Sequence, residues 1–151
     1  MKKSINILNK KARFSYDLLD TYTAGIVLTG TEIKSIRASK ASIAESFCEF
    51  NDSGELFVIN MTVQEYDHGN HFNHRPKAER KLLLNKKELR RLEKEVKNTG
   101  LTIIPTKLFI NEKGFAKLKI ALAKGKKLFD KRETIKDREN KRNLDRIKKN
   151  F

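Results

Sequence analysis

Short apolar runs separated by polar turns fill most of the first 122 residues. These runs are rich in β-branched and aromatic residues, a composition that predicts β-strands. The pattern occurs at residues 12–19, 24–30, 42–50, 55–61, 80–85, 101–110 and 115–123. The turn sequences NDSG at 51–54 and NEKG at 111–114 lie between consecutive runs and predict two β-hairpins.

Residues 30–39 have a helical period instead. Ile33 and Ile36 share one face of the predicted helix, and Lys34 and Arg37 share the adjacent face. Two interpretations of the cations are equally supported: they are a solvated face, or they meet phosphates from a rigid platform.

Residues 86–98 predict the longer helix. Its apolar stripe consists of Leu89, Leu92 and Val96. Asn85 can cap the helix, Glu88 lies three residues later as in a capping box, and Gly100 ends it.

Together, the apolar runs and the helical segments predict about six short strands and two helices. They lack the alternation of strand and helix that marks a parallel sheet. The sequence therefore predicts a mainly β (α+β) fold, a small closed or nearly closed β-barrel with peripheral helices. The one long irregular stretch, residues 64–79, predicts a loop.

Charge changes the picture at the end of the chain. Residues 123–151 hold 12 Lys and Arg against 5 Asp and Glu, a net +7 out of +15 for the whole chain. After Phe129 their large apolar residues are only Ile135, Leu144, Ile147 and Phe151, too few for a core. We therefore predict a body at 1–122 and a basic tail at 123–151 that is disordered alone and helical when bound.

A basic surface of this size indicates an acidic polymer as partner, and nucleic acid is the leading candidate. No apolar run has the roughly 18 residues of a spanning helix, and the N-terminus has no signal-peptide pattern. The single cysteine, Cys48, excludes an internal disulfide. We expect a cytoplasmic protein that does not bind membranes.

His68, His71 and His74 are the candidates for chemistry, because three imidazoles can hold zinc or transfer protons. They would have to converge from a loop, and no cysteine joins them. Loop histidines that contact RNA or solvent are the favoured interpretation, so we expect no metal site, no cofactor and no catalytic residue.

Four motifs in order carry a family resemblance: LNKKARFSY, AGIVLTGTEIKSIRASKASI, GNHFNHRPKAERKLLLNKKEL and AKGKKLFDKRETIKDRE. The chain resembles the SsrA-binding protein family, the bacterial protein partners of transfer-messenger RNA, from about residue 7 to its end. The resemblance implies an oligonucleotide-binding-type barrel and a non-enzymatic adaptor of trans-translation. Such an adaptor binds the tRNA-like domain as a monomer, takes the place of the missing anticodon arm and delivers the RNA to stalled ribosomes.

The resemblance also implies site residues. The RNA-binding positions of the body are Asn9, Lys10, Lys11, Arg13, Gly30, Glu32, Lys34, Arg37, Lys40, Arg80, Lys81, Leu83 and Asn85. For Glu32 a base edge, a ribose hydroxyl or a neighbouring cation is the expected partner, since phosphates repel an acid. For the leucines of RKLLLN, a role in the core is the favoured alternative.

The tail positions implied to contact the ribosome, at the decoding centre of the small-subunit RNA and in the mRNA channel, form a second set. They are Gly125, Lys126, Lys127, Phe129, Asp130, Lys131, Arg132, Ile147 and Lys148. Two positions depart from the pattern: Thr23 stands where some relatives carry an acid, and Phe129 where relatives often carry His or Tyr. Composition alone leaves a general RNA-binding or ribosomal protein as the alternative function; the combined motifs favour the adaptor.

Overall fold

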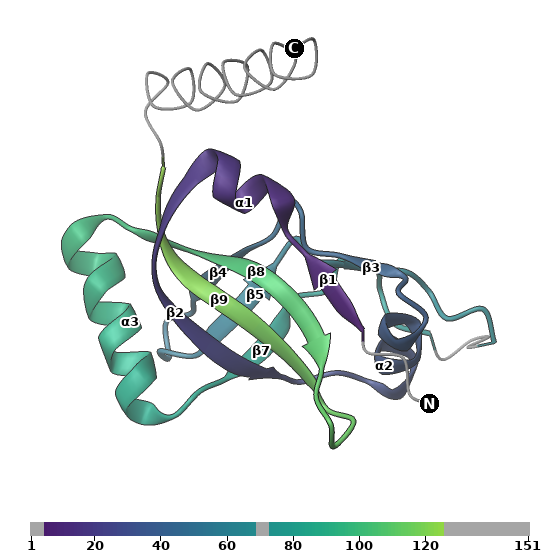
Figure 1. Ribbon diagram of the computed structural model, residues 1–151. Coiled ribbons are helices and arrows are strands. Elements are labelled where there is room, and N and C mark those ends of the chain that lie inside the picture. The colour runs from purple at the N-terminus through teal and green to yellow at the C-terminus, as the bar shows by residue number, and fades with distance from the viewer. Residues whose placement is uncertain (1–4, 69–72, 126–151) are drawn as a thin grey trace, which may run out of the picture.

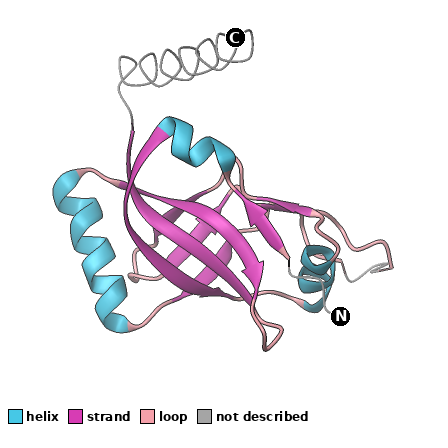
Figure 2. Ribbon diagram, in the orientation of Figure 1, coloured by secondary structure: helices cyan, strands magenta, loops and turns pink. Residues whose placement is uncertain are grey.

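The computed structural model describes residues 5–68 and 73–125 (Figures 1 and 2). The helices are α1 (Lys10–Ser15), α2 (Gly30–Arg37) and α3 (Lys86–Thr99). The strands are β1 (Asn6–Leu8), β2 (Tyr16–Ile26), β3 (Ala41–Ser42), β4 (Phe47–Phe50), β5 (Leu56–Ile59), β6 (Thr62–Val63), β7 (Arg80–Leu83), β8 (Thr102–Ile110) and β9 (Ala116–Gly125). The described chain is therefore mainly β with a few helices, as predicted.

Seven strands form one antiparallel sheet, in the order β1-β8-β4-β5-β7-β2-β9, and β8 also pairs with β9. Six of these strands, β8, β4, β5, β7, β2 and β9, thus form a cycle of pairings, and β1 joins this cycle through β8. The remaining strands, β3 and β6, pair with each other. The two hairpins predicted around residues 51–54 and 111–114 are confirmed as β4–β5 and β8–β9.

Alternation along the long strands separates a buried side of the sheet from an outer side. In β9, Leu118 and Ile120 are fully buried, whereas Lys119 between them is exposed. The main core continues with Leu108 of β8 and Ile36 of α2. Because side chains alternate with a period of two, the neighbours of these core residues face outward.

Both predicted helices are confirmed at nearly the predicted bounds. Asn85 caps α3 by accepting from the Glu88 amide at 2.9 Å, and the Glu88 side chain accepts from the Asn85 amide, which completes the capping box. Gly100 follows α3 with φ of +66°, the left-handed conformation that glycine adopts without a steric penalty. The helices lie around the sheet, each at a different place (Figure 1).

The N-terminal part of the prediction is wrong in one respect. Residues 12–19 are not a strand throughout, because the side chain of Asn9 accepts from the amide of Ala12 and starts α1. Only residues 16–19 and 24–26 of the two predicted strands lie in a strand, and they belong to one continuous strand, β2, which ends at Ile26. Apolar and aromatic content alone could not reveal the cap.

Strand β9 extends three residues beyond the predicted body, to Gly125, which pairs with Tyr16 of β2. The proposed boundary at residue 122 therefore falls within a strand. The rest of the predicted tail, with all its proposed ribosome contacts except Gly125, lies outside the described residues.

Candidate nucleic-acid interface

The first turn of α2 is fixed by a capping box. Thr29 accepts from the Glu32 amide at 3.4 Å, and Glu32 Oε1 accepts from the Thr29 amide at 2.9 Å. The helix buries Ser35 and Ile36 and leaves the side chains of Lys34 and Arg37 exposed. The predicted division of this helix into an apolar and a cationic face is therefore present, and the two cations project from an anchored element.

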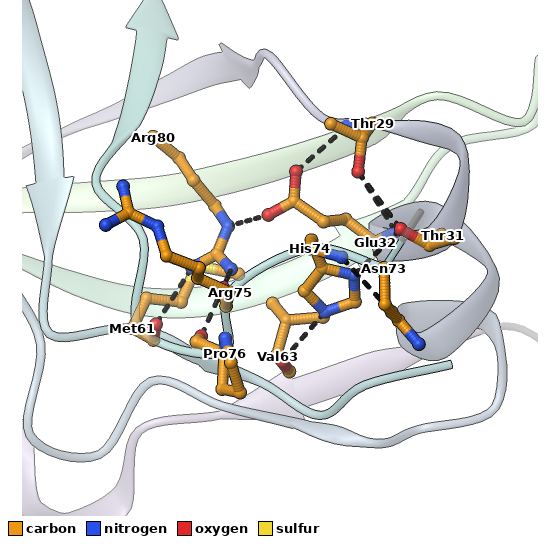
Figure 3. Close-up of polar contacts among 10 residues, drawn as sticks. All are labelled: Thr29, Thr31, Glu32, Met61, Val63, Asn73, His74, Arg75, Pro76 and Arg80. Atoms are coloured by element: carbon orange, nitrogen blue, oxygen red, sulfur yellow. Dashed lines mark hydrogen bonds and ion pairs between the residues drawn. The ribbon is translucent and has the colours of Figure 1, made fainter. Parts of the chain in front are cut away.

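Arg80 is the anchor of this region. Its Nε donates to Glu32 Oε2, its Nη1 donates to the Met61 carbonyl at 2.9 Å, and its Nη2 donates to two carbonyls (Figure 3). Those last two acceptors are Arg75 at 3.2 Å and Pro76 at 3.1 Å. The guanidinium thereby joins α2, the segment before β6 and the segment before β7 in one hydrogen-bonded group.

Glu32 and Arg80 are only 4% and 3% exposed. Burial by itself would raise the pKa of Glu32, but hydrogen bonds from the Thr29 amide and from Arg80 hold that pKa below its ordinary value of 4.5. Of the three partners that the sequence left open for Glu32, the structure supplies the neighbouring cation. Neither side chain has free surface for RNA in this arrangement.

His74 also makes hydrogen bonds inside the protein. Its Nε2 lies 2.9 Å from the Val63 carbonyl oxygen, which can only accept, so Nε2 carries the proton in the neutral ring. Its Nδ1 then accepts from the Thr31 hydroxyl at 2.9 Å (Figure 3). Both ring nitrogens are occupied, so His74 ties the 73–76 segment to α2.

Within the predicted loop at residues 64–79, two hydrogen bonds join Asn73 to the backbone of Tyr66. Asn73 accepts from the Tyr66 amide at 3.0 Å and donates to the Tyr66 carbonyl at 2.7 Å. The Tyr66 ring lies 5.3 Å from the Lys34 ammonium and contacts the His68 ring edge-on. Sequence reasoning missed Tyr66 and Asn73, although an asparagine close to an aromatic residue in a loop was the available signal.

No group of three metal-binding side chains occurs among residues 5–68 and 73–125, whereas His71 lies outside them. In the same ranges no helix is long and apolar enough to cross a membrane.

The predicted site residues near α1 differ in exposure. Asn9 is buried, and its Nδ2 donates to the carbonyls of Ile43 at 3.2 Å and Pro105 at 2.8 Å. Lys10, Lys11 and Arg13 are exposed, and Lys11 forms an ion pair with Glu45. The cations of α1 can therefore reach a ligand, whereas Asn9 holds the helix in place.

The other predicted body residues form a mixed group. Lys40 pairs with Asp67 at 2.7 Å, and Lys81 pairs with Glu55. Leu83 is 52% exposed, so the alternative of a core leucine fails at this position, although it holds for Leu82. Gly30 is the first residue of α2, and Asn85 caps α3.

A pocket beside α1 is lined by residues of the body and by Gly125 of the predicted tail. It has a volume of about 430 Å³ and is lined by Asn9, Lys11, Tyr16 and Gly125 among others. Two residues predicted to bind RNA and the first residue predicted to bind the ribosome thus lie around one depression.

The comparisons with known proteins agree with the sequence motifs. A family model described as SmpB protein matches residues 6–150. The chain is 70% identical to the SsrA-binding protein of Christiangramia forsetii, over 100% of this chain and 96% of the relative. It is 70% identical to that of Flavobacterium psychrophilum over the full length of both chains, and 53% identical to that of Agrobacterium fabrum over 93% and 88% of the two chains.

A solved structure is similar as well. It is described as "tmRNA-SmpB: a journey to the center of the bacterial ribosome", and its chain is 47% identical with a TM-score of 0.68. The match covers 82% of this chain and 86% of that one.

Proposed function

The chain belongs to the SmpB family of SsrA-binding proteins, and we propose that it holds transfer-messenger RNA through the exposed cations of α1 and α2. It is an RNA-binding adaptor of trans-translation whose partners are transfer-messenger RNA and the ribosome. The contacts proposed for the body are Lys10, Lys11, Arg13, Lys34, Arg37, Lys40, Lys81 and Leu83.

The observation that carries this proposal is the anchored cationic face of α2. Lys34 and Arg37 are exposed, while the capping box and the ion pair from Glu32 to Arg80 fix the helix that carries them. Cations on a rigid element lose less conformational freedom on binding than cations on a mobile loop. Such a surface suits phosphates and riboses, which position a protein on folded RNA.

For four of the predicted RNA contacts we propose an indirect role. Asn9, Glu32, Arg80 and Asn85 each cap or anchor a helix through bonds inside the protein. Their replacement should therefore weaken RNA binding by moving α1, α2 or α3, without removing a direct contact. Gly30 belongs with them as the residue that opens α2.

We propose further that the cycle of six paired strands is an oligonucleotide-binding-type barrel, and that the protein works in the cytoplasm, as a monomer on its RNA and without catalysis of its own. The tRNA-like domain of the RNA is the proposed ligand of the body. Gly125 and the segment from residue 126 onward are proposed to contact small-subunit RNA at the empty decoding centre and in the mRNA channel. That segment includes the predicted contacts Lys126, Lys127, Phe129, Asp130, Lys131, Arg132, Ile147 and Lys148.

The decisive experiment is to identify which RNA co-purifies with the tagged protein from bacterial cells that contain both candidate RNAs. Enrichment of transfer-messenger RNA over ribosomal RNA is the expected result. Recovery of ribosomal RNA alone would favour a general RNA-binding or ribosomal protein. A buffer series from low to high salt separates specific from purely electrostatic capture, because nonspecific binding falls steeply with salt.

A further inference from the structure

The pocket beside α1 is lined by apolar side chains from three strands. They are Tyr16 of β2, Phe47 of β4 and Ile104 of β8. These residues pack with Ala12 and Ala123 in a small apolar cluster that is separate from the main core, and the two aromatic side chains are only partly buried. The pocket volume of about 430 Å³ is well above the roughly 150 Å³ of a cavity that binds benzene, so an aromatic ring fits into it.

Charges of both signs also line the pocket. Lys11 and Glu45 belong to its lining and form an ion pair with each other, although their side chains are 69% and 66% exposed. An ion pair that is so exposed contributes little to stability, so each partner can exchange the other for a different charge. The pocket therefore suits an apolar group that is flanked by a cation and an anion.

The chain itself leaves the body at this pocket. Gly125, the last residue of β9, lines the pocket and pairs with Tyr16, which lines it too. The sequence continues with KKLFD at positions 126–130. Four residues of extended chain span at most about 14 Å, so Phe129 can reach the pocket from Gly125 without any change in the body.

The KKLFD sequence matches the lining of the pocket in its chemistry. Leu128 and Phe129 are the only two adjacent large apolar residues from position 126 onward. The two lysines before them can pair with Glu45, and Asp130 after them can pair with Lys11. The short connection to β9 also gives the segment an effective concentration on the order of millimolar, so a weak contact is enough to populate a docked state.

We propose that Phe129 docks in the pocket beside α1 while the protein is off the ribosome, as an autoinhibitory contact between the tail and its own body. The autoinhibitory consequence rests on the proposed function, in which Phe129 contacts small-subunit RNA. One side chain cannot occupy both places, so ribosomal RNA has to compete with the pocket for Phe129. Lys10 and Arg13 of α1 repel the basic tail, which keeps the docked state weak enough to be released.

Docking is tested by fluorescence in the full-length protein without RNA. The chain has no tryptophan, so Phe129→Trp supplies a single reporter. Its emission should lie at shorter wavelength, and its quenching by neutral acrylamide should be weaker, than for a reporter at the end of the tail, Phe151→Trp. Adding Ala44→Phe, which fills the pocket lining without changing any charge, should abolish both differences.

A second measurement leaves the pocket itself unaltered. The methyl signals of Ile104 in the NMR spectrum of the full-length protein should shift in Phe129→Ala and stay in place in Phe151→Ala. Ribosome binding tests the consequence. If Phe129 is docked about nine-tenths of the time, Ala44→Phe should bind stalled ribosomes about tenfold more tightly than the wild type, with unchanged affinity for transfer-messenger RNA.

The inference is overturned if the Ile104 signals are the same in the wild type and in Phe129→Ala. It is also overturned if they respond only to Phe151→Ala, which would make the chain end the occupant, or only to added RNA, which would make the pocket an RNA site. Unchanged ribosome binding by Ala44→Phe overturns the autoinhibitory role. A wild-type protein that does not prefer transfer-messenger RNA over ribosomal RNA counts against the proposed function instead, because docking is measured without RNA.

Discussion

Glu32 and Arg80 form a buried ion pair that joins the first turn of α2 to the first residue of β7. The two residues are 48 positions apart in the sequence, and each also bonds to the backbone around it. Breaking one partner of such a pair leaves a buried charge without compensation. The pair therefore couples the stability of the fold to the placement of Lys34 and Arg37, the cations proposed to hold RNA.

The first prediction is a double-mutant cycle on this pair. Arg80→Met or Glu32→Leu alone should lower the free energy of unfolding by on the order of 3–5 kcal/mol, because each leaves a buried charge unpaired. The double variant Glu32→Leu, Arg80→Met should be less destabilised than the sum of its single variants, which are measured in the same series by urea denaturation. Additive losses would show that the two side chains do not depend on each other.

The pH dependence of stability follows from the same pair. The pKa of Glu32 is lowered in the folded protein, so the unfolded chain takes up the proton first as the pH falls. The stabilisation is fully present above the ordinary value of 4.5 and is lost as the pH falls through the folded pKa. The difference in unfolding free energy between the wild type and the Glu32→Leu, Arg80→Met variant should therefore shrink between pH 6 and pH 3. A constant difference would contradict the assignment.

The cationic face of α2 gives the next prediction. Lys34→Ala with Arg37→Ala should reduce the salt slope of transfer-messenger RNA binding by roughly one unit per phosphate contact removed. Folding should change by less than about 1 kcal/mol, since both side chains are exposed and Lys34 loses only its contact with Tyr66. Lys87→Ala with Arg90→Ala on α3 is the charge-matched control. An equal loss in both pairs would indicate bulk electrostatics and not this face.

Local signals in the sequence were sufficient for most of the fold. Both hairpins and α3 depend on short motifs: Asn51 and Asn111 bond within their own turns, and Asn85 and Glu88 cap each other. The start of α1 depends instead on Asn9, whose backbone and side chain bond to Thr106 and Pro105 about a hundred residues away. No local pattern reports such partners.

The sequence indicated which side of α2 is exposed, but it could not indicate which of the predicted cations are buried. Spacing placed Lys34 and Arg37 correctly on the outer side of α2. The same reasoning could not distinguish Arg80, which is buried, from the exposed cations, because burial depends on where Met61 and Pro76 present their carbonyls. The strand register was needed to show that Lys107, Lys117 and Lys119 lie on the same outward side of β8 and β9.

His74 supports a prediction about structure and not about chemistry. Replacing it with Ala removes hydrogen bonds to Thr31 and to the Val63 carbonyl, so the free energy of unfolding should fall by about 1–3 kcal/mol. His68→Ala is the control, because His68 is exposed and makes an edge contact with Tyr66. Neither substitution should change the metal content that elemental analysis measures in the purified protein. Stoichiometric zinc that is lost in His74→Ala would contradict the structural role.

The last prediction separates the body from the tail. A chain that ends after Gly125 keeps all of β9, including the pairing of Lys124 and Gly125 with Asp17 and Tyr16. It loses residues 126–151, which hold 11 Lys and Arg against 5 Asp and Glu, a net +6. The truncated protein should fold and bind transfer-messenger RNA, with only the nonspecific attraction of that charge removed. In a reconstituted system with stalled ribosomes it should not support peptide tagging.

Two further variants test whether a loss of tagging comes from the net charge of the tail or from specific contacts. Asp130→Ala, Lys131→Ala and Arg132→Ala together lower the net charge by only one. A large loss of tagging from this change therefore has to come from specific contacts, because the long-range field is almost unaltered. Ile147→Asp should also impair tagging if that side chain docks on RNA. Each variant is compared in an RNA-binding titration and a tagging assay run side by side, and full tagging by the truncated chain would refute the proposed division between body and tail.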